Sequence, residues 1–128
     1  MKLVVEISAG ELIDKITILE IKLEHIRDEA KRANISREYA ALVGALHREI
    51  VDDQRLSRLR GELKSVNAEL WRIEDKIRAQ EREQTFGDEF IALARAVYRT
   101  NDKRARLKRD INLLAGSELV EEKSYEAY

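Results

Sequence analysis

The sequence predicts an all-α protein: an antiparallel bundle of three to four helices, with a short N-terminal strand that could pair with the C-terminal tail. Two observations predict this class. First, the 128 residues include no proline and five glycines, while charged residues make up 38% and aromatic residues 5%. That composition is typical of long helices and lacks the turn and aromatic residues of a β-sandwich or barrel. Second, apolar residues recur at alternating spacings of three and four, the period of packed helices.

The N-terminal segment 2–7 predicts a short strand, because its three odd-numbered residues are apolar and the period is two. An isolated strand leaves its backbone hydrogen bonds unmet, so it needs a partner within the chain or from another copy. We expect it to form a two-stranded ribbon with the tail at residues 117–128, near Leu119 and Val120.

The first helix is expected over residues 9–33. Ser8 and Glu11 are three apart and fit a capping box, in which each side chain satisfies a free amide at the helix start. An apolar seam of the coiled-coil type follows for three heptads. It consists of Leu12, Ile16, Leu19, Leu23, Ile26, Ala30 and Ala33.

The second helix is expected over residues 37–51, after a break at 34–36 in which Ser36 is the N-cap. The aspartates at 52–53 can cap the next helix. The alternative is one long kinked helix over residues 37–83, because no proline or glycine enforces a break at 52–53.

Two long helices complete the prediction, over residues 54–83 and 86–115. The first of them carries a second clean seam of apolar residues. Thr85 and Asp88 are spaced as an N-cap pair for the second, and Gly116 is a natural stop in the left-handed conformation. The seam consists of Leu56, Leu59, Leu63, Val66, Leu70, Ile73 and Ile77.

Long helices joined by short loops pack as antiparallel neighbours, so we expect a single domain over residues 1–128 with up-down-up-down order. The second helix is shorter than the others and leaves part of their apolar surface uncovered. Exposed apolar strips mark interfaces, and we therefore expect a homo-oligomer, most simply a dimer, or a helical protein partner.

The helix at 86–115 carries a polar anomaly, because its apolar stripe is interrupted between Thr100 and Arg104. Antiparallel packing brings its basic side chains toward carboxylates of the first helix. We expect Arg104 beside Glu20 and Lys108 near Ile16, because the arginine fork suits a carboxylate. The candidate site residues are Asp14, Lys15, Glu20, Arg99, Asn101, Asp102, Arg104 and Lys108.

These polar strips have two interpretations. In the first, they form a structural layer that fixes helix register in a non-enzymatic, self-associating interaction module. In the second, Arg99, Asn101, Arg104 and Lys108 hold a small anion bearing phosphate or carboxylate, and the carboxylates of the first helix or Asp102 supply acid–base chemistry. The first interpretation is favoured, since the chain has no phosphate-binding glycine loop or nucleophile motif.

Charge and composition narrow the remaining classes. The 24 basic and 25 acidic side chains give a net charge of -1, which does not favour nucleic acid or membrane as a partner. The chain has no cysteine, and its two histidines lack metal-ligand spacing, so we expect no metal and no cofactor. No apolar run reaches the roughly 20 residues that span a bilayer. A cytoplasmic protein is the expectation.

Two stretches carry a resemblance: Gly10 to Lys22, and Tyr98 to Arg104 continuing through Ser117 to Tyr125. Together they resemble an uncharacterised family of small all-helical bacterial proteins, over nearly the whole chain. That resemblance implies a free-standing bacterial domain and no particular activity. The segment Glu11 to Ile16 is also similar to helical chorismate mutases, which clamp a dianion between helices. This chain lacks their arginine before the first helix and their late glutamine.

Overall fold

A computed structural model describes all residues of the chain, 1–128, as four α-helices without a β-strand. The helices are α1 (Ala9–His25), α2 (Glu29–Glu49), α3 (Gln54–Glu83) and α4 (Asp88–Ala115). The all-α class is therefore confirmed. None of these helices combines the length and the apolar character that crossing a bilayer requires.

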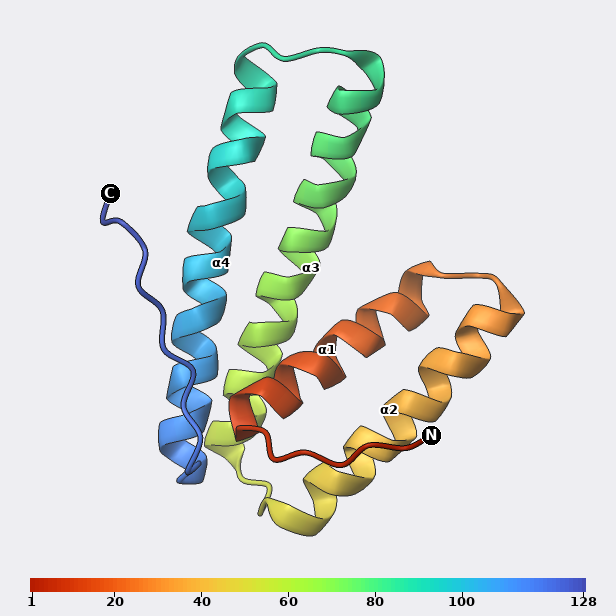
Figure 1. Cartoon of the computed structure of the whole chain (residues 1–128), viewed down its shortest axis with the longest axis vertical. Coiled ribbons are helices and arrows are strands. Elements are labelled where there is room, and N and C mark those ends of the chain that lie inside the picture. Colours follow the sequence, from red (N-terminus) through yellow and green to blue (C-terminus); the bar gives the residue numbers. More distant parts are fainter.

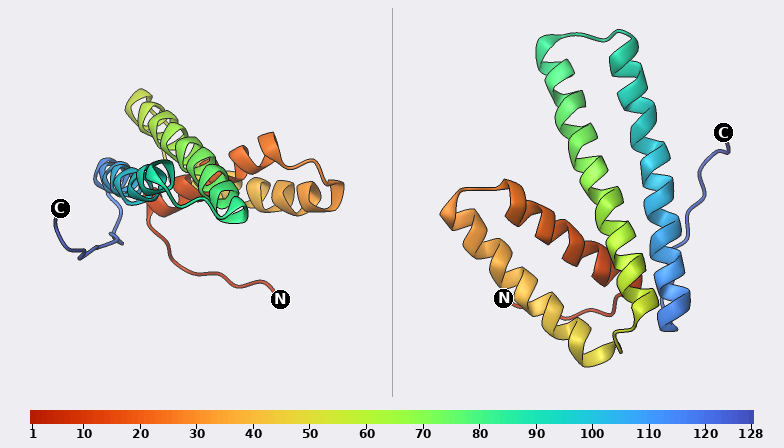
Figure 2. Two further views of the ribbon diagram at one scale, coloured as in Figure 1. Left: turned by 90° about the horizontal axis from the view of Figure 1, so that it is seen from above. Right: turned by 180° about the vertical axis from the view of Figure 1, so that it is seen from behind.

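The four helices form two antiparallel hairpins, one short (α1 and α2) and one long (α3 and α4) (Figure 1). The short hairpin leans across the lower half of the long one at an angle, so the upper half of the long hairpin projects beyond it (Figures 1 and 2). Helix α1 lies at the centre, since it packs against all three others. The small apolar core lies where they meet. Its buried members are Leu12, Ile13, Ile16, Leu46, Leu56, Leu63 and Ile111.

Short polar side chains decide where three of the helices begin. The side chain of Ser8 accepts a hydrogen bond from the amide of Glu11 at 3.1 Å, as expected of an N-cap. The reciprocal half of the capping box is absent, because the Glu11 carboxylate pairs with Lys15 and Lys108 instead. Asp53 caps α3 as Ser8 caps α1, and its Oδ1 lies 2.8 Å from the amide of Leu56. The chain therefore turns before α3, and the alternative of one long kinked helix is wrong.

The predicted boundary between the first two helices is wrong. Helix α1 ends at His25 instead of residue 33, and residues 34–36 lie inside α2. Asp28 caps α2 by accepting a hydrogen bond from the amide of Lys31 at 2.9 Å. The guanidinium of Arg32 donates to the carbonyls of Leu23 and Ile26, which satisfies the free end of α1. These local bonds define a turn that the continuing apolar seam concealed.

Helix α4 begins at Asp88, two residues later than predicted, and Thr85 does not cap it. Its N-cap is Gly87, while the hydroxyl of Thr85 donates to the side-chain oxygen of Gln80 at 2.7 Å. At the other end the prediction is confirmed, since Gly116 stops the helix with φ of 66°.

The predicted N-terminal strand and its ribbon with the tail are absent. Residues 2–7 are extended but form no ladder, and the tail runs back along α4 instead (Figure 1). Ion pairs hold the tail there, between Lys108 and Glu121 at 2.7 Å and between Arg109 and Glu122 at 3.6 Å. Two glutamates of the tail are therefore engaged by α4, and the tail follows that helix instead of the N-terminal segment.

Candidate functional site

The centre of the candidate site is a buried ion pair between α1 and α4. Asp14 is only 1% exposed, and Arg104 donates to both of its carboxylate oxygens, from Nε at 2.9 Å and from Nη2 at 2.5 Å. Such a two-pronged contact fixes the plane of the guanidinium as well as its position. The pair therefore holds α1 and α4 in one relative alignment.

Helix α3 completes this polar layer through Asn67. Its side-chain amide donates to Asp14 Oδ1 at 2.9 Å and to Thr17 Oγ1 at 3.0 Å. The Thr17 hydroxyl donates in turn to the backbone carbonyl of Asp14 at 2.8 Å. No buried side-chain nitrogen or oxygen in the chain lacks a hydrogen-bond partner. The polar groups between the three helices are thus fully satisfied, which is the condition for burying them.

Both members of the central pair are charged over a wide pH range. Burial raises the pKa of Asp14, but hydrogen bonds from Arg104 and Asn67 outweigh burial, so its pKa lies below the ordinary value. The hydrogen bond to Asp14 raises the pKa of Arg104 further. A carboxylate held ionised in this way is poorly suited to act as a general acid near neutral pH.

A second contact between α1 and α4 lies one helical turn away, at Gly10. The backbone amide of Gly10 donates to Asn112 Oδ1 at 2.6 Å. A Cβ at this position would lie 2.4 Å from the backbone oxygen of Lys108, so only glycine permits the two helices to come this close. This contact sets the register between the start of α1 and the end of α4.

Lys108 joins the tail to this contact. Its side chain is 9% exposed, and its ammonium group lies 2.8 Å from Glu11 Oε2 and 2.7 Å from Glu121 Oε2. Burial lowers the pKa of Lys108, but the hydrogen bonds to these two glutamates outweigh burial and raise it. A buried cation is therefore neutralised by one carboxylate from α1 and one from the tail.

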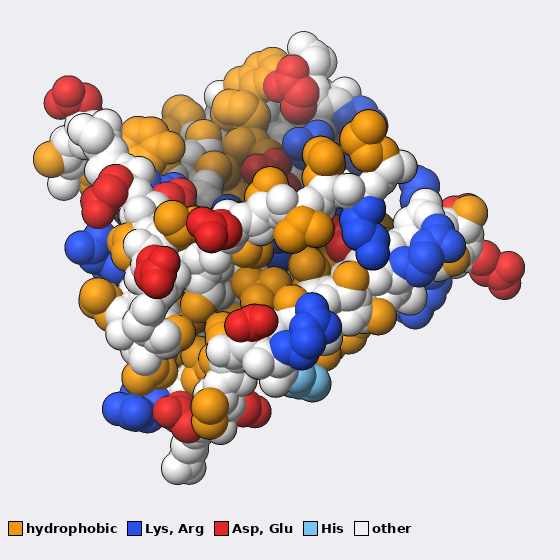
Figure 3. Space-filling model, turned by 60° about the horizontal axis from the view of Figure 1, so that its bottom comes forward, with side chains coloured by type: hydrophobic (Ala, Val, Ile, Leu, Met, Phe, Trp, Pro, Cys, Tyr) orange, Lys and Arg blue, Asp and Glu red, His pale blue; other side chains and the backbone are white.

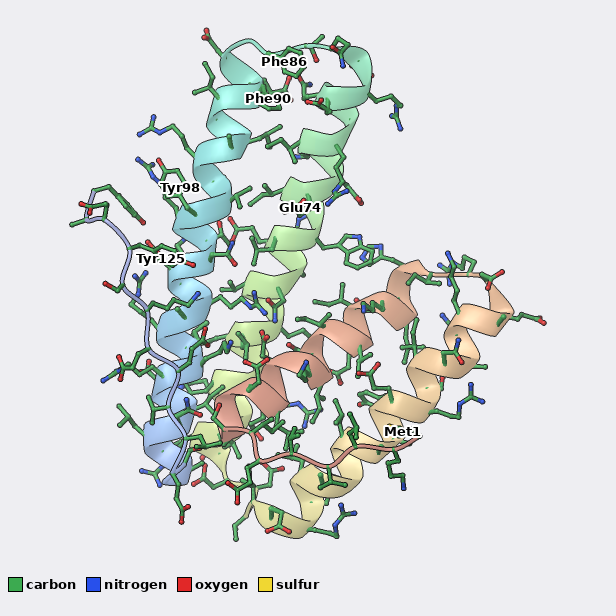
Figure 4. All side chains as sticks on the ribbon, viewed as in Figure 1. Met1, Glu74, Phe86, Phe90, Tyr98 and Tyr125 are labelled. Carbon is green, nitrogen blue, oxygen red and sulfur yellow. The ribbon has the colours of Figure 1, made fainter.

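An open cavity of about 480 Å³ adjoins the buried pair, in the angle between α1 and the long hairpin. Arg104, Asn101 and Asn67 form its polar end. Glu74 lies further up α3 (Figure 4), and Glu74 and Asp75 bring negative charge to the same cavity. The cavity therefore has a fixed guanidinium beside the buried pair and, further up α3, two carboxylates, of which Glu74 is paired with Arg78 at 3.2 Å. The remaining lining residues are Ile18, Ile21, Leu70, Trp71 and Arg78.

The predicted partner of Arg104 is wrong, because the helix register differs from the expected one. Arg104 meets Asp14 instead of Glu20, and Lys108 meets Glu11 instead of Ile16. The six-residue difference at Arg104 corresponds to about 9 Å along a helix. The close approach at Gly10 explains it, because that contact anchors the first turn of α1 on the last turns of α4.

Of the predicted site residues, Asp14, Asn101 and Arg104 lie together, and Lys108 lies one turn away. The other four lie elsewhere, as follows. The carboxylate of Glu20 accepts a hydrogen bond from the Tyr39 hydroxyl at 3.1 Å and pairs with Arg60 at 3.4 Å. Asp102 accepts a hydrogen bond from the Tyr128 hydroxyl. Lys15 pairs with Glu11 on the surface, and Arg99 is exposed.

Sequence reasoning missed several residues of this layer, chiefly Asn67, Asn112 and Gly10. Asn67 gave no signal, because Val66 beside it already fills the seam position between Leu63 and Leu70. Gly10 gave none either, because one glycine in the first turn of a helix does not reveal which neighbour approaches it. The structure brings no group of three or more histidine or carboxylate side chains into a metal-binding arrangement.

Comparison with known proteins gives one match. A family model described as "Family of unknown function (DUF6165)" matches residues 1–128, the whole length of the chain. No curated protein and no solved structure matches the chain.

Proposed function

We propose that this chain, which belongs to the DUF6165 family, is a non-enzymatic helical interaction module that associates with a second copy of itself. The observation that carries the proposal is the accessible surface of the isolated chain, which is 9225 Å². A folded monomer of 14.9 kDa exposes about 7,000 Å². The excess is larger than the roughly 800 Å² that each partner contributes to a standard interface.

The excess surface includes large apolar side chains on two parts of the molecule. On the long hairpin, Phe86, Ile91 and Tyr98 are 48%, 53% and 43% exposed. The N-terminal segment exposes a second set of large apolar side chains. From below, hydrophobic side chains line the hollow between the helices and stay visible among scattered charges (Figure 3). Apolar surface that one chain leaves open is what association with a second copy would cover.

In this proposal the buried layer around Asp14 has a structural role. It fixes the angle at which the short hairpin crosses the long one, so that both copies present the same surface. A polar layer that specifies one alignment at little gain in stability is a known use of buried ion pairs.

The direct test is the mass of the untagged chain in solution, measured by sedimentation equilibrium over a range of micromolar concentrations. We expect a concentration-dependent mass that approaches twice 14.9 kDa. A mass of one chain at every concentration would contradict the proposal. Repeating the measurement at high salt separates apolar association, which persists, from adventitious charge attraction, which is screened.

A second candidate function is binding of a small molecule that carries a carboxylate or phosphate, by a binding protein or an enzyme. One observation favours it. Asp14 occupies two nitrogens of Arg104, while Nη1 contacts only Asn101, at 3.5 Å, beside the open cavity. A guanidinium oriented by one carboxylate and open on another edge is ready to receive a second anion.

Replacing Arg104 is a poor test of this candidate, because it would leave Asp14 buried without its partner. Asn101→Ala removes a cavity group and spares the buried pair, and Asp102→Asn is a matched control because Asp102 is the next residue and lies outside the cavity. With inorganic phosphate or succinate as the titrant in calorimetry, we expect binding to weaken in the first variant only. Equal binding by both variants, or no binding by the wild type, would contradict this candidate.

A further inference from the structure

The N-terminal segment before α1, residues 1–7, is an extended apolar arm without a partner. Leu3, Val4 and Val5 are 80%, 89% and 74% exposed. Seen from above, the arm leads away from the helices instead of lying on them (Figure 2). None of the backbone hydrogen bonds of the chain involves residues 1–7. The arm thus combines exposed apolar side chains with a fully unpaired backbone edge.

The arm has the composition of a strand, and no segment of its own chain is paired with it. Its residues are largely β-branched or apolar, and the odd-numbered ones fall on one face. Within a protein, a strand edge pairs with another extended segment, and the four helices offer none. The tail is the one other extended segment, and Glu121 and Glu122 tie it to α4.

We propose that the arms of two copies pair with each other as an antiparallel ribbon centred on Val4. This inference rests on the self-association proposed above and names the surface that begins it. The register follows from the charges. Antiparallel pairing about Val4 places Lys2 opposite Glu6 of the second copy, twice by symmetry, and places Leu3 opposite Val5.

Other pairings of the arms are less favourable. A parallel ribbon places Lys2 opposite Lys2 and Glu6 opposite Glu6, and like charges directly opposite each other are destabilising. An antiparallel ribbon shifted to centre on Val5 keeps the apolar face but sets Val4 opposite Glu6. Within one arm, Lys2 and Glu6 are four residues apart, about 13 Å in a strand, so they cannot pair with each other.

A two-stranded ribbon is marginal alone and needs a surface to pack on. The beginning of the tail lies beside the base of the arm, because the amide of Ala9 donates to Ser117 Oγ at 3.3 Å. Leu119 and Val120 follow at once and are 44% and 37% exposed. Each copy therefore places an exposed apolar pair, Leu119 and Val120, next to the ribbon. The dimer would have two such surfaces on which the ribbon can pack.

Cross-linking gives the sharpest test of the register, because the chain has no cysteine of its own. Val4→Cys places two thiols directly opposite each other, within the Cα separation that a disulfide allows. Val5→Cys is the matched control, since its two copies lie diagonally, beyond that range. Under mild oxidation we expect a covalent dimer from Val4→Cys and at least fivefold less from Val5→Cys. The opposite order, or equal yields, would overturn the register.

A charge exchange tests the pairing without a covalent bond. Lys2→Glu and Glu6→Lys each convert both ion pairs into like-charge contacts, and we expect each to raise the dimer dissociation constant about tenfold. The double variant Lys2→Glu/Glu6→Lys restores opposite charges between the copies, so its dissociation constant should return to within about twofold of the wild type.

The outcomes separate this inference from the proposed function. If the wild type is a dimer and neither single variant weakens it, the ribbon is wrong and self-association stands. If the single variants weaken the dimer and the double variant does not restore it, the antiparallel register is wrong. If the wild type is a monomer at all concentrations, both proposals fail. Circular dichroism of each variant confirms that the helices are intact.

Discussion

Gly10 is the residue on which the packing of α1 against α4 depends most directly. A side chain there would meet the backbone oxygen of Lys108, and backbone cannot move aside as a flexible side chain can. The contact also brings the Gly10 amide within reach of Asn112, so one residue provides both the close approach and a hydrogen bond. Small changes at this point therefore affect the alignment of the whole polar layer.

We predict that Gly10→Ala lowers the free energy of unfolding by about 1–3 kcal/mol, the usual cost of overpacking. Gly61→Ala is the matched control, because a Cβ at Gly61 meets nothing within 4 Å on α3. That change should stabilise the protein by about 0.5–1 kcal/mol, as helical alanine gains over glycine. Urea unfolding followed by circular dichroism measures both, and a neutral Gly10→Ala would contradict the tight approach.

The buried carboxylate of Asp14 should make the free energy of unfolding depend on pH in the acid range. Its pKa in the folded protein lies below the ordinary value of about 4, so its contribution to stability is complete above that pH. The contribution is lost as the pH falls through the lowered folded value. Asp14→Asn should therefore reduce the loss of unfolding free energy as the pH falls below about 4.

The control for this measurement is Asp75→Asn, which changes an exposed carboxylate that forms no ion pair. We expect this variant to follow the acid profile of the wild type in urea unfolding at each pH. If Asp14→Asn and the wild type lose stability in parallel, the buried pair is not the source of the acid sensitivity.

Among the helices and connecting segments, the tail depends on α4 for its position. Lys108 and Arg109 bind Glu121 and Glu122, and further along the chain Tyr128 packs edge-on against Tyr98 at 5.1 Å between ring centres. Figure 4 shows Tyr98 and Tyr125 on facing sides of α4 and the tail. The tail has no backbone ladder, so its path is defined by these side-chain contacts together with the hydrogen bond from the Tyr128 hydroxyl to Asp102.

We predict that Glu121→Gln loosens the tail without disturbing the helices, since Lys108 keeps its contact with Glu11. Limited proteolysis should cut the variant between residues 117 and 128 several times faster than the wild type. Glu118→Gln is the control, because Glu118 forms no ion pair. Equal cutting of the two variants would show that the pair with Lys108 does not hold the tail.

The sequence predicts elements better than it predicts their contacts. The seam over residues 54–83 is unbroken and its cap is strong, so α3 has the expected bounds. The turn at 26–28 was not predicted, because the apolar spacing continues past it to Ala30 and Ala33. Alanine favours any helix, so these two residues fit the predicted first helix although they belong to α2. The partner of Arg104 could not be predicted, because helix register depends on where two backbones come closest, and periodicity holds no such information.

For the molecule as a whole, the angle between the hairpins leaves stability unevenly distributed. Helix α1 packs on the inner part of the long hairpin, where Leu63 is fully buried and Asn67 nearly so. The outer part has only the contacts between α3 and α4, with Phe86 packed edge-on against Phe90 at 5.1 Å near the tip (Figure 4). Local opening should therefore begin at the tip.

We predict that amides in residues 80–97 exchange with deuterium at least tenfold faster than those in residues 56–67. The measurement is exchange mass spectrometry at a dilution where the chain is a monomer. Fewer buried contacts lower the free energy of local opening, and exchange follows it. Uniform protection along the long hairpin would contradict this distribution.

The path of the tail has a further consequence, for the charge of the protein. The tail at 117–128 has four glutamates and one lysine, so the chain's net charge of -1 leaves +2 on the preceding residues. Six basic residues between Arg99 and Arg109 lie on the helix that the tail follows. The tail thus acts as a built-in counterion. Cleavage near Gly116 would therefore change the net charge of the protein from negative to positive. The clipped protein would bind to a cation exchanger that the intact chain passes through, so ion exchange would detect proteolysis early.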